Sequence, residues 1–260
     1  MKVLICKSHD AAVERTANMI AAHVRGRSAP VLGLATGGTM LPLYERLAKL
    51  HRETDLSFAD CSTFNLDEYV GIAPDHPASY HSYMREALFR HVDIDLRRTH
   101  LPRGDADDVH VEAESFEARI DAAGGISLQL LGIGQNGHIG FNEPTSSLGS
   151  RTRIKTLTES TRTANRQYFG PDETAPRYAL TMGVGTILNA RECLMLATGS
   201  SKAAAVAAMI EGPVSAVCPA SALQLHARAT VVLDRDAAAG LRLTDYYQHV
   251  HPNGEATRFD

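Results

Sequence analysis

Residues 126–144 read Ile-Ser-Leu-Gln-Leu-Leu-Gly-Ile-Gly-Gln-Asn-Gly-His-Ile-Gly-Phe-Asn-Glu-Pro. The apolar run 126–131 is typical of a buried strand, and it continues into a loop with four glycines, His138 and Glu143. Glycine lets a backbone pass close to a ligand or adopt a positive φ, where a side chain would clash. This combination predicts an active-site loop at the end of a strand. The alternative is a glycine-rich turn that carries a surface histidine.

Short apolar runs alternate with helical spacings along the whole chain, which is typical of an α/β fold with a mainly parallel sheet flanked by helices. Further strands are expected at 3–6, 31–35, 61–66, 192–197 and 229–233. Helices are expected from a cap at Asp10 onward and over 41–50, 83–91, 109–122 and 203–210. The polar segment 157–179 is predicted to be a mobile lid, with an ordinary surface excursion as the alternative. We find no repeat or linker, which favours one domain over residues 1–260.

The composition limits the classes of partner. The chain has 260 residues and a formal net charge of −4, and it has no dense basic patch with interleaved aromatics, so a nucleic-acid partner is not expected. No apolar stretch approaches membrane-spanning length, and the apolar run at the amino terminus is too short for a signal peptide. Four scattered cysteines without a CxxC pair predict free thiols in a reducing compartment. We therefore expect a cytoplasmic protein without a membrane partner.

Reactive side chains follow four of the predicted strands, at the edge of the sheet where ligands bind in open α/β folds. One strand ends at Asp67, which could serve as a general base or as a helix cap. Two others lead into glycine- and hydroxyl-rich turns that precede helices, and such turns suit a phosphate. Their residues are Thr36, Gly37, Gly38 and Thr39 in the first turn, and Gly199, Ser200, Ser201 and Lys202 in the second. Together they indicate a phosphorylated small molecule.

Three other kinds of site fit less well. The pattern G-x-G-x-x-G at 132–137 matches a dinucleotide fingerprint, but no helix directly follows it and it is not in the first βα turn. A zinc site lacks a second His or Cys at ligand spacing, and a serine hydrolase lacks a G-x-S-x-G elbow. A dyad in which Glu143 fixes the tautomer of His138 and raises its basicity fits the central loop better.

Seven segments together resemble the glucosamine-6-phosphate deaminases. They are TGGT at 36–39, FNLDEYVG at 64–71, HPASY at 76–80, GIGQNGHIGFNEP at 132–144, SRTRIKT at 150–156, ALTMGVG at 179–185 and GSSK at 199–202. The resemblance implies a modified Rossmann-like fold related to that of the 6-phosphogluconolactonases. It also implies conversion of glucosamine 6-phosphate and water to fructose 6-phosphate and ammonia, without a redox cofactor or a catalytic metal.

The resemblance also implies roles for single residues. His138, held by Glu143 and Asn136, would open the sugar ring, and Asp67 would move a proton from C2 to C1. The phosphate would bind the turn at 36–39, Lys202 and Arg166. Arg166 is displaced by one position from the family's arginine, and Gln167 takes that position; Asn136 stands where some members have Asp. We expect Asn136 to hold His138 without adding a negative charge.

Regulation and assembly follow only from the resemblance. Ser146, Arg153 and Lys155 match the site at which hexameric members bind N-acetylglucosamine 6-phosphate as an activator, and a solvated basic strand is the alternative. A hexamer or a trimer is implied. Galactosamine 6-phosphate is the nearest rival substrate, because no residue is identified that would contact the C4 hydroxyl. A lactonase-like hydrolase and a sugar-phosphate sensor without catalysis are the remaining alternatives.

Overall fold

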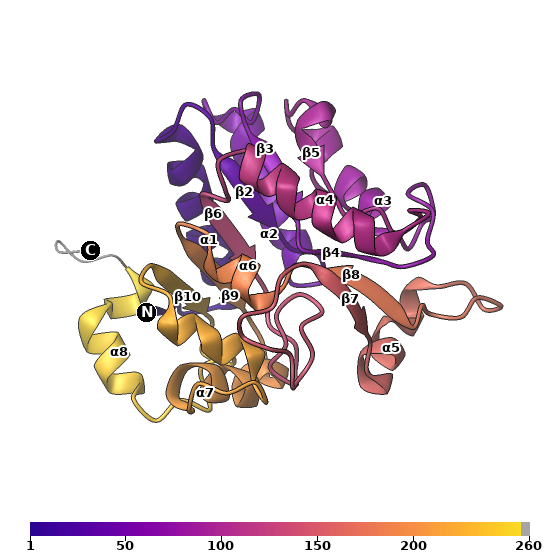
Figure 1. The fold of residues 1–260 in the computed structure, drawn as a ribbon. Helices are drawn as coiled ribbons and strands as arrows, with labels where there is room; N and C mark the ends of the chain where they lie inside the picture. Colours follow the sequence, from indigo (N-terminus) through magenta and orange to yellow (C-terminus); the bar gives the residue numbers. More distant parts are fainter. Residues whose placement is uncertain (256–260) are drawn as a thin grey trace.

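The computed structural model describes residues 1–255 and has a central sheet flanked by helices (Figure 1). Seven strands form this sheet in the order β1-β10-β9-β6-β2-β3-β5, and every neighbouring pair is parallel. Their bounds are β1 Lys2–Ile5, β2 Val31–Leu34, β3 Ser62–Asn65, β5 Thr99–His100, β6 Leu128–Leu131, β9 Cys193–Ala197 and β10 Ala229–Leu233. The predicted α/β class with a mainly parallel sheet is confirmed. All of the long strands that the apolar runs predicted are present.

The helices are α1 His9–Arg25, α2 Met40–Glu53, α3 Tyr80–Ala87, α4 Val109–Ala122, α5 Glu159–Asn165, α6 Val184–Leu188, α7 Ala203–Glu211 and α8 Thr244–Val250. The predicted cap of α1 is wrong, because Ser8 accepts the bond from the Ala11 amide and Asp10 lies in the first turn. Helix α3 begins three residues earlier than its apolar spacing predicted and ends at Ala87. Its start is fixed by polar groups: the Ser79 hydroxyl accepts from the Ser82 amide and caps the helix.

A second, antiparallel sheet was not predicted. It contains β4 (Asp67–Tyr69), β8 (Tyr178–Thr181) and β7 (Arg153–Thr156), in that order. The sequences of β4 and β7 are short and polar, so neither has the apolar run that indicates a strand. Leu66 joins the two sheets: its amide donates to the Leu34 carbonyl of the large sheet, and its carbonyl accepts from the Met182 amide next to β8. Asp67 therefore stands at the junction of the two sheets.

The segment between β7 and β8 contains α5 and corresponds to the residues that the sequence predicts to be a lid; it is called the lid segment below. Leu157, Phe169 and Ala175 from this segment pack with Tyr69 and Phe141 in an apolar cluster separate from the main core. Their packing attaches the segment to the small sheet. Its mobility stays a prediction, as does the single domain expected over residues 1–260.

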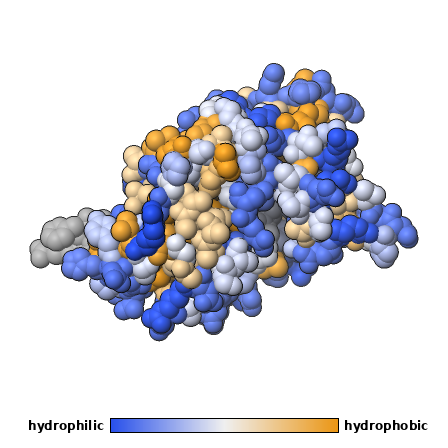
Figure 2. Space-filling model, turned by 90° about the horizontal axis from the view of Figure 1, so that it is seen from below, coloured by the Kyte–Doolittle hydropathy of each residue, from blue (hydrophilic) through white to orange (hydrophobic). Residues whose placement is uncertain are grey.

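The outer surface is mixed in character. Figure 2 views the molecule from below and shows hydrophobic and hydrophilic residues interspersed over that face. Within residues 1–255, no helix combines the length and the apolar character that crossing a bilayer requires. All four cysteines are free thiols, as predicted, and three of them are buried.

The centre of the large sheet should dominate stability. Leu194 in β9 is 1% exposed and lies in register between Thr230 of β10 and Leu130 of β6. We expect Leu194→Ala to lower the free energy of unfolding by about 2–5 kcal/mol, because the cavity it leaves cannot collapse between two neighbouring strands. Leu225→Ala is the matched control: its side chain is 67% exposed, and a change within about 0.5 kcal/mol is expected. Urea denaturation of both variants checks this, and equal losses would contradict the described core.

Candidate active site

A cavity of about 560 Å³ lies where the predicted reactive segments meet. It is lined by the turn at 36–39, by Asp67, by the central glycine loop and by Lys202, so the structure brings together four of the predicted strand ends. The further lining residues are Ala35, Met40, Leu66, Tyr80, Phe141, Ser160, Thr161, Ala164, Asn165, Gln167 and Tyr168. The last six of these come from α5 and the residues just after it. The lid segment therefore forms one wall.

Asp67 is a carboxyl group in an apolar position. It is 5% exposed, and burial, assisted by the negative charge of Glu68, raises its pKa to about 8. Bonds from the Phe141 amide and the Thr181 hydroxyl act in the opposite direction but do not outweigh burial. Gly140 brings the central loop against this carboxyl: its φ is +53°, and a Cβ there would lie 3.1 Å from Asp67 Oδ2. A carboxyl with this pKa can both take and return a proton near neutral pH.

The imidazole and the carboxylate of the central loop lie together, as predicted. His138 Nδ1 is 3.4 Å from Glu143 Oε2, and Glu143 is 2% exposed. Burial alone would raise the pKa of Glu143, but contacts with His138, Thr161 and Asn136 outweigh it and lower the pKa to about 2. The carboxylate is thus charged at neutral pH and faces Nδ1 at ion-pair distance, while Nδ1 has no hydrogen bond among the described residues. Glu143 therefore orients the ring by its charge, and Nε2 is the nitrogen left for proton transfer.

Asn136 was expected to hold the imidazole of His138, but its side chain bonds the Glu143 carboxylate and the backbone of His138. Its amide nitrogen donates to Glu143 Oε2 at 2.7 Å, and its oxygen accepts from the backbone amide of His138 at 3.2 Å. The side chain thus fixes the carboxylate and the loop, and it does not bond the imidazole directly. Thr161 supports the same carboxylate at 2.5 Å and Thr158 does so at 3.2 Å. The sequence analysis missed both threonines, because they lie in the polar segment that has no apolar pattern.

The opposite end of the cavity suits an anion. The turn at 36–39 precedes α2, and Gly37 has a φ of +112°, which glycine tolerates. The start of α2 favours a negative charge through the helix dipole, although the Met40 amide donates to the Gly37 carbonyl and Pro42 has no N–H. Lys202 is half-buried, and burial lowers its pKa. Its turn is held by Asp234, whose carboxylate accepts from the Gly199 amide at 3.0 Å.

Arg166 is not brought to this end. Its guanidinium donates to the carbonyls of Phe169, Gly170 and Pro171 at 2.7–2.9 Å. Within residues 1–255 the lining of the cavity includes Gln167 and Asn165 but not Arg166. The guanidinium therefore organises its own turn, and the expected contact between Arg166 and a phosphate stays a prediction.

The three residues matched to an activator site lie outside the cavity lining of the described chain. Arg153, on β7, is half-buried and donates to Asn142 Oδ1 at 2.8 Å. Asn142 in turn donates to the carbonyls of Ile139 and Met182. Ser146 is 2% exposed, and Lys155 lies on β7 as well. These contacts place Arg153 directly behind the central loop.

Comparison with known proteins agrees with this geometry. A family model described as glucosamine-6-phosphate isomerases/6-phosphogluconolactonase matches residues 7–232. A protein of Hahella chejuensis (strain KCTC 2396), named glucosamine-6-phosphate deaminase, is 51% identical over 250 residues, which are 96% of this chain and 95% of that protein. A protein of Marinomonas sp. (strain MWYL1) with the same name is 53% identical over 252 residues, 95% of this chain and 94% of that protein.

Two solved structures resemble this chain, one in sequence and fold and the other in fold alone. A structure described as a monomeric glucosamine-6-phosphate deaminase superposes with a TM-score of 0.90 at 46% identity and covers 92% of this chain and 100% of that one. The 6-phosphogluconolactonase of Trypanosoma brucei has a TM-score of 0.74 at 18% identity, covering 92% of this chain and 98% of that one, a similarity that concerns the fold alone. The family match over most of the length, together with relatives about half identical, shows that this chain belongs to the glucosamine-6-phosphate isomerase and 6-phosphogluconolactonase family.

Proposed function

We propose that this chain is a glucosamine-6-phosphate deaminase of aminosugar catabolism, which converts glucosamine 6-phosphate and water to fructose 6-phosphate and ammonia. The observation that carries the proposal is Asp67, a buried carboxyl with a pKa of about 8 in the same cavity as the His138–Glu143 pair. An isomerisation between C2 and C1 needs one base that takes a proton and returns it. The names of the half-identical relatives support the same activity.

The mechanism begins with ring opening. His138 moves the proton of the anomeric hydroxyl to the ring oxygen, which breaks the C1–O5 bond and leaves an aldehyde at C1. Asp67 then takes the proton from C2, the electron pair forms a C1–C2 double bond, and a proton of the C2 ammonium passes to O1, which gives an enolamine with a neutral amine. Asp67 returns the proton to C1, and the nitrogen becomes an imine at C2. Water adds to C2 and ammonia leaves, which yields the ketone of fructose 6-phosphate.

The phosphate has a positioning role in this proposal. It binds the turn formed by Thr36, Gly37, Gly38 and Thr39 together with Lys202, and it holds C1 and C2 near Asp67. Arg166 stays a predicted phosphate ligand, and it would have to exchange its bonds to three carbonyls for the contact. No residue of the described cavity is identified as a partner of the C4 hydroxyl, so galactosamine 6-phosphate is the second candidate substrate.

The direct test incubates the purified protein with glucosamine 6-phosphate or galactosamine 6-phosphate and measures the ammonia released. A parallel assay measures hydrolysis of 6-phosphogluconolactone. Release from the first alone supports the proposal as stated. Faster release of ammonia from galactosamine 6-phosphate would show that this sugar is the preferred substrate. Hydrolysis of the lactone without ammonia release from either sugar would overturn the deaminase, and binding without any turnover would favour a sensor.

Regulation by N-acetylglucosamine 6-phosphate through Ser146, Arg153 and Lys155, and a hexamer or trimer, are part of the same proposal. The regulation is supported by the bond from Arg153 to Asn142, which links β7 to the central loop, and the assembly rests on the resemblance alone. The 46% identical solved relative is described as monomeric, so assembly needs its own measurement. Sigmoidal kinetics that become hyperbolic with the acetylated sugar phosphate, in an oligomer by sedimentation, would support regulation. A monomer with hyperbolic kinetics would remove it.

Asp67→Asn should separate catalysis from stability. We expect kcat to fall by about two to four orders of magnitude, because the proton shuttle is lost. The pKa of Asp67 in the folded protein, about 8, lies above its ordinary value, so the fold favours the neutral form and loses stability as the pH rises from about 4 to about 8. The amide of the variant is neutral at every pH, so the variant should exceed the parent in free energy of unfolding at pH 9 by at least about 1 kcal/mol.

Denaturation of both proteins at pH 5 and pH 9 checks the stability effect, and ammonia release checks the activity. At pH 5 the two should differ much less than at pH 9. A variant that retains the parental kcat would remove Asp67 from the mechanism. Equal stability differences at both pH values would contradict the raised pKa.

Lys202→Met should weaken substrate binding. A charge-assisted hydrogen bond contributes about 1.5–3 kcal/mol, so we expect KM to rise about tenfold to a hundredfold, with a smaller effect on kcat. Lys49→Met is the matched control, because that lysine is half-exposed on α2 and lies 4.0 Å from Glu53. Its KM should be unchanged. A parental KM in Lys202→Met would remove the lysine from the phosphate site.

A further inference from the structure

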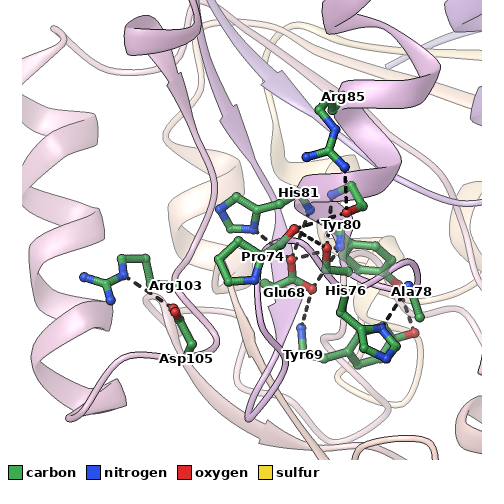
Figure 3. A network of polar contacts seen from close by, with 12 residues as sticks. Glu68, Tyr69, Pro74, His76, Ala78, Tyr80, His81, Arg85, Arg103 and Asp105 are labelled. Atoms are coloured by element: carbon green, nitrogen blue, oxygen red, sulfur yellow. Dashed lines mark hydrogen bonds and ion pairs between the residues drawn. The ribbon is translucent and has the colours of Figure 1, made fainter.

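Glu68 is a buried carboxylate that the proposed reaction does not use. It follows Asp67 in β4 and is 1% exposed. Successive side chains of a strand point to opposite faces, so Glu68 lies on the face of β4 away from Asp67. Figure 3 shows it pointing at the first turn of α3, among Tyr80 and His81. A buried carboxylate outside the reaction calls for a physical explanation, because burying a charge is costly unless it is paired.

The carboxylate of Glu68 receives the free N–H groups that begin α3. The Tyr80 amide donates to Oε2 at 2.9 Å, and the His81 amide does so at 3.1 Å. His81 Nδ1 lies 2.9 Å from the same oxygen, and the Tyr69 amide donates to Oε1 at 2.9 Å. These contacts are drawn in Figure 3. A negative charge at this end of a helix is favourable, so Glu68 fixes both the position and the direction of α3.

Helix α3 carries two tyrosines toward the cavity. Tyr80 lines it, and its ring stacks on that of Phe141 with centroids 6.1 Å apart. The Tyr80 hydroxyl donates to that of Tyr69 at 3.2 Å, their ring centroids are 5.0 Å apart, and Tyr80 lines the same cavity as Asp67. The Tyr83 hydroxyl donates to the Gly37 carbonyl at 2.8 Å and so holds the phosphate turn. One helix thus touches both ends of the site.

We propose that Glu68 is a positioning residue: by holding the start of α3, it places Tyr80 against Asp67 and Tyr83 against the turn at 36–39. The inference rests on the proposed function, because it concerns the base of that reaction. Glu68 has two effects on the pKa of Asp67, and both raise it. The wall that includes Tyr80 buries Asp67, and the charge of Glu68 repels a second negative charge beside it, so both raise the pKa of Asp67.

The titratable groups around Asp67 lie on different elements. Glu68 and Tyr69 lie on its own strand, Tyr80 lies on α3, and His138 and Lys202 line the same cavity. Burial raises the pKa of both Tyr69 and Tyr80 above its ordinary value, so neither tyrosine loses its proton near neutral pH. Among the described contacts, Glu68 bonds none of the residues of the central loop. A change at Glu68 therefore reaches Asp67 without breaking a bond of the His138–Glu143 pair.

The test is Glu68→Gln, which keeps the shape and one acceptor oxygen but removes the charge. The acid limb of the kcat profile, where Asp67 becomes protonated, should move to lower pH by about one unit. At the pH optimum kcat should fall about tenfold, because the remaining base is weaker. With fructose 6-phosphate and ammonia, exchange of the C1 proton with deuterated water should slow by the same factor, since it reports proton transfer at Asp67 without ring opening of the aminosugar.

Glu112→Gln is the matched control. Glu112 is 8% exposed, accepts from the Arg103 amide and the Arg119 guanidinium, and lies on α4 outside the cavity lining of the described chain. It should lose stability while keeping the position of the acid limb. If Glu68→Gln also keeps that position, or if it retains the parental kcat, the positioning role is overturned.

Two further arms separate the remaining outcomes. The parent protein is assayed first: an inactive parent refutes the proposed function, whereas an active parent with an unaltered Glu68→Gln refutes only the role of Glu68. If Glu68→Gln is unfolded at the assay temperature, Tyr83→Phe decides. That variant loses the bond to Gly37, and its KM should rise about threefold to tenfold with an unchanged acid limb. An unchanged KM overturns the proposal.

Discussion

The site depends on the burial of one carboxyl group at the junction of two sheets. Leu66 bonds the large parallel sheet with its amide and the edge of the small sheet with its carbonyl, so the next residue, Asp67, has no freedom to move into solvent. Burial then raises the pKa of Asp67 to about 8. The charged form of Asp67 lowers the stability of the folded protein. This loss occurs at the position where the proposed reaction needs a base. The small sheet is what makes this position possible.

The small sheet is stabilised by its own apolar cluster, which is separate from the main core. Its apolar cluster contains Tyr69 from β4, Phe141 from the central loop and Phe169 from the lid segment. Each of these elements also contributes to the cavity or to its support: β4 carries Asp67, the loop carries His138, and the segment carries Thr161. A single small core therefore joins Asp67, the His138–Glu143 pair and the wall beside them. Displacing one element would disturb all three.

The sequence predicted the large sheet well, and the small one not at all. Strands such as β9 are buried on both faces and appear as continuous apolar runs, so their type and position could be recognised. By contrast, β4 consists of Asp-Glu-Tyr, and its strand conformation comes from pairing with β8, which is distant in the sequence. The strand ends identified the cavity because parallel strands end at one edge. Thr161 and Tyr80 were missed because only the folded chain brings them there. The sequence also could not show that local carbonyls bind the guanidinium of Arg166.

The similarity of fold to lactonases does not decide between the two activities of the family, since an 18% identical structure shares the architecture. The electrostatics of the cavity favour an aminosugar. Burial and Glu68 keep Asp67 near a balance between its neutral and charged forms. An ammonium group within about 4–6 Å lowers the pKa of a carboxyl by roughly one to three units. The C2 ammonium of glucosamine 6-phosphate would therefore convert Asp67 to its basic form on arrival, next to the proton that must be removed. A lactone brings no such charge, so the raised pKa of Asp67 is an advantage only for a substrate that carries its own cation.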